Sequence, residues 1–156
     1  MSIRTEAGRE ARAGIAAALS TLLADSYTLY LKTQNYHWNV EGPQFHSLHT
    51  MFEAQYVELR EAVDRIAERL RALGFPAPGS YAAYAELTSI GEATEDITPA
   101  DDMVRTLAEG HETLAATARA AVEEADKAND VATADLATNR VETHEKTAWM
   151  LRAMSA

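Results

Sequence analysis

The chain has 156 residues, the size of one domain with a full hydrophobic core. Its 14 basic and 24 acidic residues give a formal charge of −10, which argues against electrostatic binding to DNA or to an anionic membrane surface. The absence of cysteine excludes disulfides, thiolate metal sites and cysteine nucleophiles. No apolar run approaches the ~20 residues that span a bilayer, and the N-terminus lacks the apolar segment of a secretory signal. We therefore expect a cytoplasmic protein without membrane partners.

Alanine, leucine, glutamate and arginine dominate the sequence, a composition typical of an all-helical domain. Apolar residues at spacings of three and four predict a first helix within 6–39. Gly42 and Pro43 then break the chain, and we expect Pro43 to begin a second helix that runs to about residue 73. Gly74 and the proline-rich residues after it end this helix.

A long connection follows, with one short helix at 80–87 that begins at a serine. Thr98 as the cap and Pro99 at the first position predict a third long helix to about residue 127. A turn at 128–130 leads to a fourth long helix that ends near residue 154. These elements predict an all-α four-helix bundle with a short extra helix in the crossover between its second and third helices. We expect 1–156 to form one domain, with about 1–8 as a short N-terminal tail.

The histidines are the first candidates for chemistry, and they are His37, His46, His49, His111 and His144. No HExxH motif and no glycine-rich phosphate loop is present. Bundles that hold two metals inside one chain use Glu-x-x-His on two helices. The residue three places before each histidine is Gln, Pro, His, Ala or Val, and never Glu. A two-metal site inside a single chain is therefore not predicted.

The second predicted helix suggests a different arrangement. His49 and Glu53 are four residues apart, as are Asp64 and Glu68, so that each pair shares a face and all lie within about 100° of the helix surface. The two pairs are about 22 Å apart along the axis, too far to hold one metal together. Two such helices packed antiparallel about a two-fold axis would bring the pairs together at two equal sites, which His37 could complete. Nitrogen and carboxylate ligands suit Fe(II), Mn(II) or Zn(II).

Simpler explanations of these residues stay open. Asp64 and Glu68 lie among arginines of the same helix (Arg60, Arg65, Arg69, Arg71), which is also the pattern of an exposed ladder of ion pairs. His37 lies between Tyr36 and Trp38 and suits a packing role at a helix end. On this alternative the chain is a helical interaction module without metal chemistry.

Several segments together resemble the Dps family (DNA-binding protein from starved cells, the mini-ferritins). They are NYHWNVEGPQF at 35–45, HSLH at 46–49, FEAQY at 52–56, VDRIAER at 63–69 and EKTAWML at 145–151. The family pattern is a histidine in a YHWNV-type segment, a second histidine twelve residues on, an acid four residues later, and then DxxAER. Every spacing of that pattern is present, and the resemblance covers essentially the whole chain.

The resemblance implies a ferroxidase centre at a dimer interface. His37, His49 and Glu53 of one subunit would bind iron with Asp64 and Glu68 of its two-fold mate, and Glu53 stands where some members carry Asp. Fe(II) would be oxidised to Fe(III), preferably by hydrogen peroxide rather than dioxygen. The product would be stored as a ferric mineral in a homododecameric shell, which protects DNA from oxidative damage.

The resemblance also implies an iron-entry pore near the start of the fourth helix, where Asp126, Asp130 and Asp135 lie. The alternative for Asp130 is capping of that helix. Family members that bind DNA commonly carry a lysine-rich tail, and the first fourteen residues here contain no lysine. We therefore expect no tight DNA binding. The competing function is a DNA-binding, nucleoid-compacting stress protein with an incidental metal site, and association with the nucleoid stays open.

Overall fold

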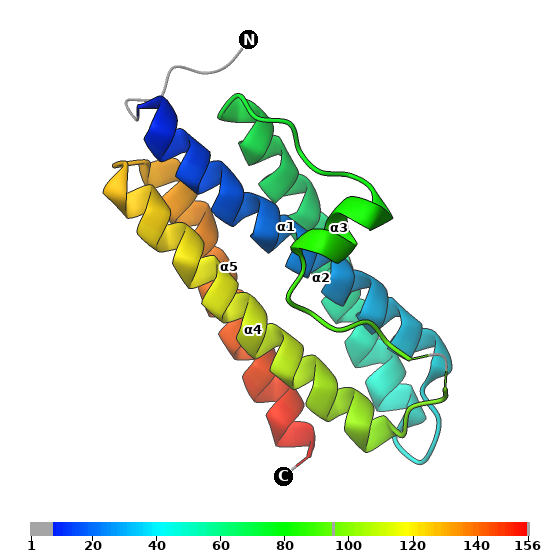
Figure 1. Ribbon diagram of the computed structural model, residues 1–156. Coiled ribbons are helices and arrows are strands. Elements are labelled where there is room, and N and C mark those ends of the chain that lie inside the picture. Colours follow the sequence, from blue (N-terminus) through cyan, green and yellow to red (C-terminus); the bar gives the residue numbers. More distant parts are fainter. Residues whose placement is uncertain (1–7, 95, 156) are drawn as a thin grey trace.

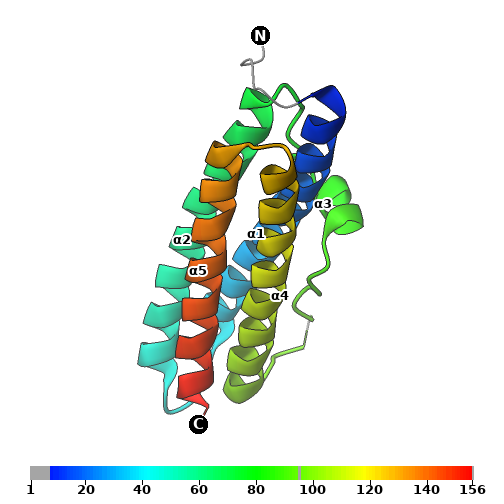
Figure 2. The same cartoon turned by 90° about the vertical axis from the view of Figure 1, so that its left-hand side faces the viewer.

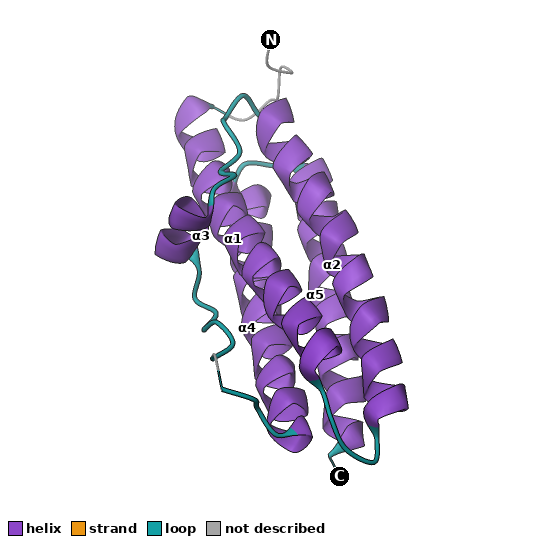
Figure 3. Cartoon of the chain, turned by 90° about the vertical axis from the view of Figure 1, so that its right-hand side faces the viewer, coloured by secondary structure: helices purple, strands orange, loops and turns teal. Residues whose placement is uncertain are grey.

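The computed structural model describes residues 8–94 and 96–155, so the expected tail at 1–8 lies outside the described residues except for Gly8. Four long helices lie side by side as a bundle: α1 (Arg9–Asn39), α2 (Phe45–Ala72), α4 (Ala100–Lys127) and α5 (Val131–Met154). The short α3 (Tyr81–Leu87) lies in the connection between α2 and α4 and runs over the outside of α1 (Figures 1 and 3). The prediction of an all-α bundle with an extra helix in the crossover is confirmed.

Two helix starts differ from the expected ones, in both cases at a proline. The backbone N–H of Phe45 donates to the carbonyl of Gly42 at 3.1 Å, so Pro43 lies inside a turn and α2 begins at Phe45. Gly42 has φ of 112°, a conformation that favours glycine. Pro99 is the N-cap of α4 rather than its first residue. The predicted serine start of α3 is confirmed, because the Ser80 hydroxyl accepts a hydrogen bond from the Ala83 N–H.

The core lies between the long helices and is filled by leucine, isoleucine and phenylalanine side chains. Its largest fully buried side chain is Phe52, and Leu22, Leu59 and Leu107 are also fully buried. Helices α1 and α2, α1 and α4, and α4 and α5 approach closely along their lengths, whereas α2 and α5 make few close approaches. Figure 2 shows α2 and α5 next to each other on the side that faces the viewer. The helix backbones are therefore closer together on three sides of the bundle than between α2 and α5, whose buried side chains still belong to the same core.

A buried carboxylate ties the crossover to the bundle. Asp25 of α1 accepts hydrogen bonds from the Thr88 hydroxyl at 2.8 Å and from the N–H and hydroxyl of Ser89 at 2.7 and 2.8 Å. The hydroxyl of Thr117, on α4, also donates to Asp25 at 2.8 Å. Asp25 is completely buried. These contacts, called the Asp25 clamp below, fix where the chain leaves α3.

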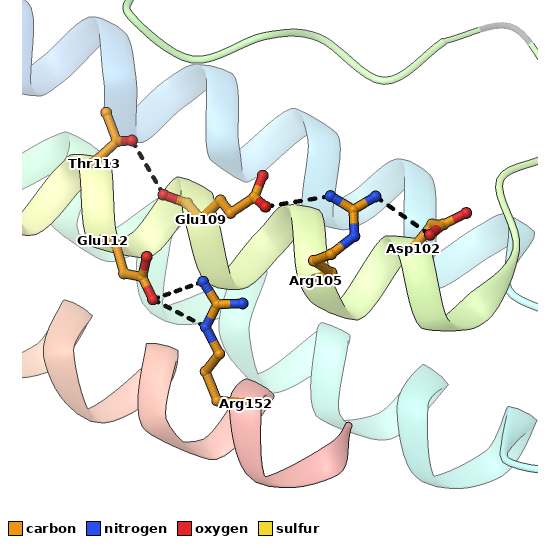
Figure 4. A network of polar contacts seen from close by, with 6 residues as sticks. All are labelled: Asp102, Arg105, Glu109, Glu112, Thr113 and Arg152. Atoms are coloured by element: carbon orange, nitrogen blue, oxygen red, sulfur yellow. Dashed lines mark hydrogen bonds and ion pairs between the residues drawn. The ribbon is translucent and has the colours of Figure 1, made fainter. Parts of the chain in front are cut away.

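Exposed ion pairs lie along α4 and between α4 and α5 (Figure 4). Arg105 pairs with Asp102 at 3.3 Å and with Glu109 at 3.2 Å along α4. Glu112 pairs with Arg152 of α5 at 2.9 Å. Pairs that are this exposed contribute little to stability, so the bundle depends on its core. No helix in the described part of the chain combines the length and the apolar character needed to cross a membrane.

Candidate metal centre

Two histidines from different helices meet where α1 ends and α2 begins. Nδ1 of His37 donates to the carbonyl of His49 at 2.7 Å, and Nδ1 of His49 donates to the carbonyl of His37 at the same distance. A carbonyl oxygen only accepts, so each neutral ring carries its proton on Nδ1 and leaves the lone pair of Nε2 free. This is the tautomer that binds a metal through Nε2.

Neighbouring aromatic rings hold the histidine pair in place. The two imidazoles stack with 3.8 Å between their centroids and 13° between their planes. Phe45 stacks on His49 at 5.0 Å, and Tyr56 meets His37 edge-on at 5.2 Å. His37 is buried and His49 half-buried. The turn at Gly42 thus converts a separation of twelve residues into a rigid pair of nitrogen donors.

The predicted carboxylates lie on the exposed side of α2. Glu53 follows His49 by one helical turn, and Asp64 and Glu68 lie one turn apart nearer the other end of the helix. A hydrogen bond with Asp64 and its negative charge raise the pKa of Glu68. Two carboxylates this close are a favourable environment for a cation, which would relieve their repulsion.

The structure of one chain does not bring the two groups together. We call His37, His49 and Glu53 the histidine half-site, and Asp64 with Glu68 the carboxylate half-site. Along α2, His49 and Asp64 are about 22 Å apart. Among the described residues, no group of three or more histidine or acidic side chains within one chain is placed to hold a metal ion. The ligand set stays a prediction that requires a second chain.

The alternative of an ion-pair ladder on α2 finds no support in the described part of the chain. None of its ion pairs joins Asp64 or Glu68 to an arginine. Arg69 instead reaches across to Asp130 at 2.9 Å and to the Thr133 hydroxyl at 2.9 Å. The carboxylate half-site is therefore open to a partner.

The candidate pore residues differ in their surroundings. Asp130 is buried, its carboxylate caps α5 by accepting from the Thr133 N–H at 3.1 Å, and it pairs with Arg69. Burial alone would raise the pKa of Asp130, but the hydrogen bonds from Thr133 and the charge of Arg69 outweigh it and lower that pKa. Asp126 and Asp135 are exposed on either side of the turn. The capping role expected as the alternative for Asp130 is present.

One group of buried polar residues was not predicted from the sequence. His111 of α4 and His144 of α5 contact each other through their Nδ1 atoms at 2.9 Å, and Arg140 links His144 to Glu58 of α2. The signal was present in the spacing, because His144 shares a helix face with Ala137, Ala148 and Leu151. The HExxH and Glu-x-x-His patterns depend on neighbours in the sequence, so their absence at both histidines does not indicate a contact between α4 and α5.

Comparisons with known proteins identify the family of the chain. A model of the ferritin-like domain matches residues 16–156. An uncharacterized low temperature-induced protein of Nostoc is 43% identical over 145 residues, which cover 92% of this chain and 81% of that protein. DNA protection during starvation protein 2 of Bacillus anthracis is 38% identical over 135 residues, which cover 86% of this chain and 92% of that protein.

A solved structure gives the same result for the fold. The Dps protein of Vibrio cholerae, described as a member of a broad superfamily of ferritin-like diiron-carboxylate proteins, superposes with a TM-score of 0.90 at 29% identity and covers 99% of this chain and 100% of that one. The bundle with its crossover helix thus defines a ferritin-like protein. Within that class the chain belongs to the Dps family, as its motifs predicted.

Proposed function

We propose that the protein oxidises and stores iron at centres that form between two copies of α2. The observation that carries this proposal is the division of the ligands into two half-sites near opposite ends of α2, with His37 reaching the first from the end of α1. Among the described residues, neither half-site is placed to hold a metal ion within one chain. An antiparallel pair of α2 helices about a two-fold axis would place each histidine half-site against the partner's carboxylate half-site. One dimer would then contain two identical centres.

The donor set suits Fe(II) as the substrate. The two Nε2 lone pairs supply the borderline nitrogen donors and the carboxylates supply charge and oxygen donors, a combination typical of iron sites with open positions. The same donors also accept Mn(II) and Zn(II). The description of the Vibrio cholerae relative as a diiron-carboxylate protein favours iron.

The proposed activity is that of a ferroxidase. Two Fe(II) ions give one electron each to hydrogen peroxide, which yields two Fe(III) ions and two hydroxide ions and releases no hydroxyl radical. The locked histidines keep their lone pairs directed at the substrate, and the carboxylates offset the charge that builds up on oxidation. Fe(III) is the harder acid and favours oxygen ligands, so it leaves the histidines for a mineral core.

Storage requires a closed shell, and we propose the homododecamer that the family resemblance implies. Asp126 and Asp135, exposed beside the turn between α4 and α5, are the candidates for an acidic entry pore, with Asp130 as the residue that fixes the turn. Removal of Fe(II) together with peroxide would protect DNA without contact to it. This route suits a chain with a formal charge of −10 better than direct DNA binding does.

The test is a comparison of iron oxidation in matched variants. Fe(II) is added without oxygen, peroxide follows, and the absorbance of the ferric product is recorded. We expect His49→Ala and Asp64→Ala each to slow the initial rate at least about tenfold. His46→Ala and Glu61→Ala are the controls, since both residues are exposed on α2 outside the half-sites. Equal rates in all four variants would contradict the proposal.

A further inference from the structure

The backbones of α2 and α5 approach each other closely at few places, and two ion pairs, Glu58–Arg140 and Arg69–Asp130, cross the seam between them. A cavity of about 330 Å³ borders it, lined among others by Ala62, Ile66 and Arg140, and a second of about 460 Å³ lies further along. Glu58 lines both cavities. Between them its carboxylate accepts two hydrogen bonds from the Arg140 guanidinium, at 2.6 and 2.8 Å. This ion pair is the connection between α2 and α5 at the middle of the seam.

Behind the ion pair, the hydrogen bonds continue into the core. Arg140 contacts Nε2 of His144 at 3.0 Å, and Nδ1 of His144 lies 2.9 Å from Nδ1 of His111. Arginine only donates, so Nε2 of His144 is the acceptor and its proton is on Nδ1. Nδ1 of His111 then accepts, and His111 carries its own proton on Nε2. Each hydrogen bond of the series requires both rings to be neutral.

Adding a proton to either ring breaks this series of hydrogen bonds. A proton on Nε2 of His144 would face the guanidinium of Arg140, and a proton on Nδ1 of His111 would face the N–H of His144. Among the described residues, the charge that acts on both rings is the positive charge of Arg140. Helix α5 presents Arg140, helix α2 presents Glu58, which Arg140 already neutralises, and helix α1 approaches next to His111 with Leu29, against Gly110.

The pKa values of the two histidines are both shifted in the direction that this geometry requires. Burial, and then the charge of Arg140, lowers the pKa of His111 to about 3. Burial, with His111 and Arg140 beside it, also lowers the pKa of His144 well below its ordinary value. Both groups bind protons more readily when exposed, so opening of the seam becomes easier as the pH falls below about 6.5.

We propose that Glu58, Arg140, His144 and His111 form an acid-sensitive latch that holds α2 against α5 and opens this seam when the histidines are protonated. The Arg69–Asp130 pair at the far end of the seam acts as the hinge. Asp130 keeps its charge there in mild acid because Thr133 and Arg69 favour its ionised form. The latch is independent of the metal centre, since none of its residues belongs to a half-site.

The pH dependence of the opening equilibrium is set by the number of protons taken up in each opening event. One proton per opening event gives about a tenfold increase per pH unit below 6.5, and two give about a hundredfold increase. The chain contains no cysteine, so one introduced thiol reports on one place. Ala62→Cys replaces a residue of the seam cavity that is only 3% exposed. Ile66→Cys gives a second reporter on the same cavity.

The experiment measures labelling of the introduced thiol by a pyridyl disulfide, a reagent that stays reactive in acid, in the assembled protein between about pH 7.5 and 5. Each rate is divided by that of the same variant unfolded in urea at the same pH. Ala118→Cys, fully buried on α4, is the control for global unfolding. We expect the seam reporters to gain at least about tenfold per pH unit below 6.5 while the control does not change.

A variant whose latch contains no titrating histidine tests whether protonation of these histidines causes the acid response. In the double variant His111→Leu, His144→Gln, the glutamine oxygen can accept the hydrogen bond from Arg140 and neither residue titrates. We expect the acid response of the seam reporters to disappear in this background. The proposal is overturned if both seam reporters are unresponsive to pH, if they respond equally in the double variant, or if the α4 control becomes reactive in step with them.

Discussion

The Asp25 clamp gives the most direct prediction about stability. Asp25→Ala removes the acceptor of four hydrogen bonds, from Thr88, Ser89 (twice) and Thr117. A hydrogen bond to a charged acceptor contributes roughly 1.5–3 kcal/mol, and a donor left buried without a partner costs a similar amount. Water can reach part of the freed loop, so we expect a loss of about 3–5 kcal/mol in the free energy of unfolding. Asp25→Asn keeps the shape and some acceptor capacity, and we expect about half that loss.

The assay combines urea unfolding at one fixed protein concentration with hydrogen exchange at single amides. The Ser89 amide donates to Asp25 and should lose protection in Asp25→Ala, whereas the amide of Leu59, in the middle of α2, should keep its relative protection. A loss of less than about 1 kcal/mol in Asp25→Ala, or a Ser89 amide that exchanges as in the parent, would refute the clamp.

Three further predictions concern the pore turn, the core and nucleic acid. Asp130→Ala removes the cap of α5 and the partner of Arg69 and should cost about 2–3 kcal/mol in urea unfolding, whereas exposed Asp126→Ala should stay within about 0.5 kcal/mol. Phe52→Ala should cost about 3–5 kcal/mol in the same assay, because the side chain is fully buried. In a mobility-shift assay at about 0.15 M salt we expect no stable complex with DNA, and a retarded band would contradict this.

The helices could be predicted from the sequence because their signals are local. Apolar spacing and the breaks at Gly42 and Gly74 depend on neighbouring residues only, and the long helices lie where the pattern places them. The starts at prolines were wrong by one or two residues. Whether Pro43 belongs to the helix or to the turn before it depends on the hydrogen bond from Phe45 to Gly42, which the residue types do not reveal.

The candidate site also has one part that the sequence predicts and another that only the packed structure shows. The spacing of His49, Glu53, Asp64 and Glu68 on one helix can be read from the sequence, because helix geometry alone determines it. The exchange of hydrogen bonds between His37 and His49 depends on how the turn joins α1 to α2. The pairing of His111 with His144 depends on the register between α4 and α5, which only the packed structure defines.

The central claim is that each iron centre takes ligands from two chains, and mixed assemblies test it most directly. Neither His49→Ala nor Asp64→Ala alone contains an intact centre. A dimer with one chain of each kind contains one intact centre, formed by His49 of the second variant and Asp64 of the first. Random co-assembly of equal amounts should therefore restore peroxide-driven Fe(II) oxidation to about one quarter of the parent rate. Mixed assemblies no more active than either variant alone would contradict the claim.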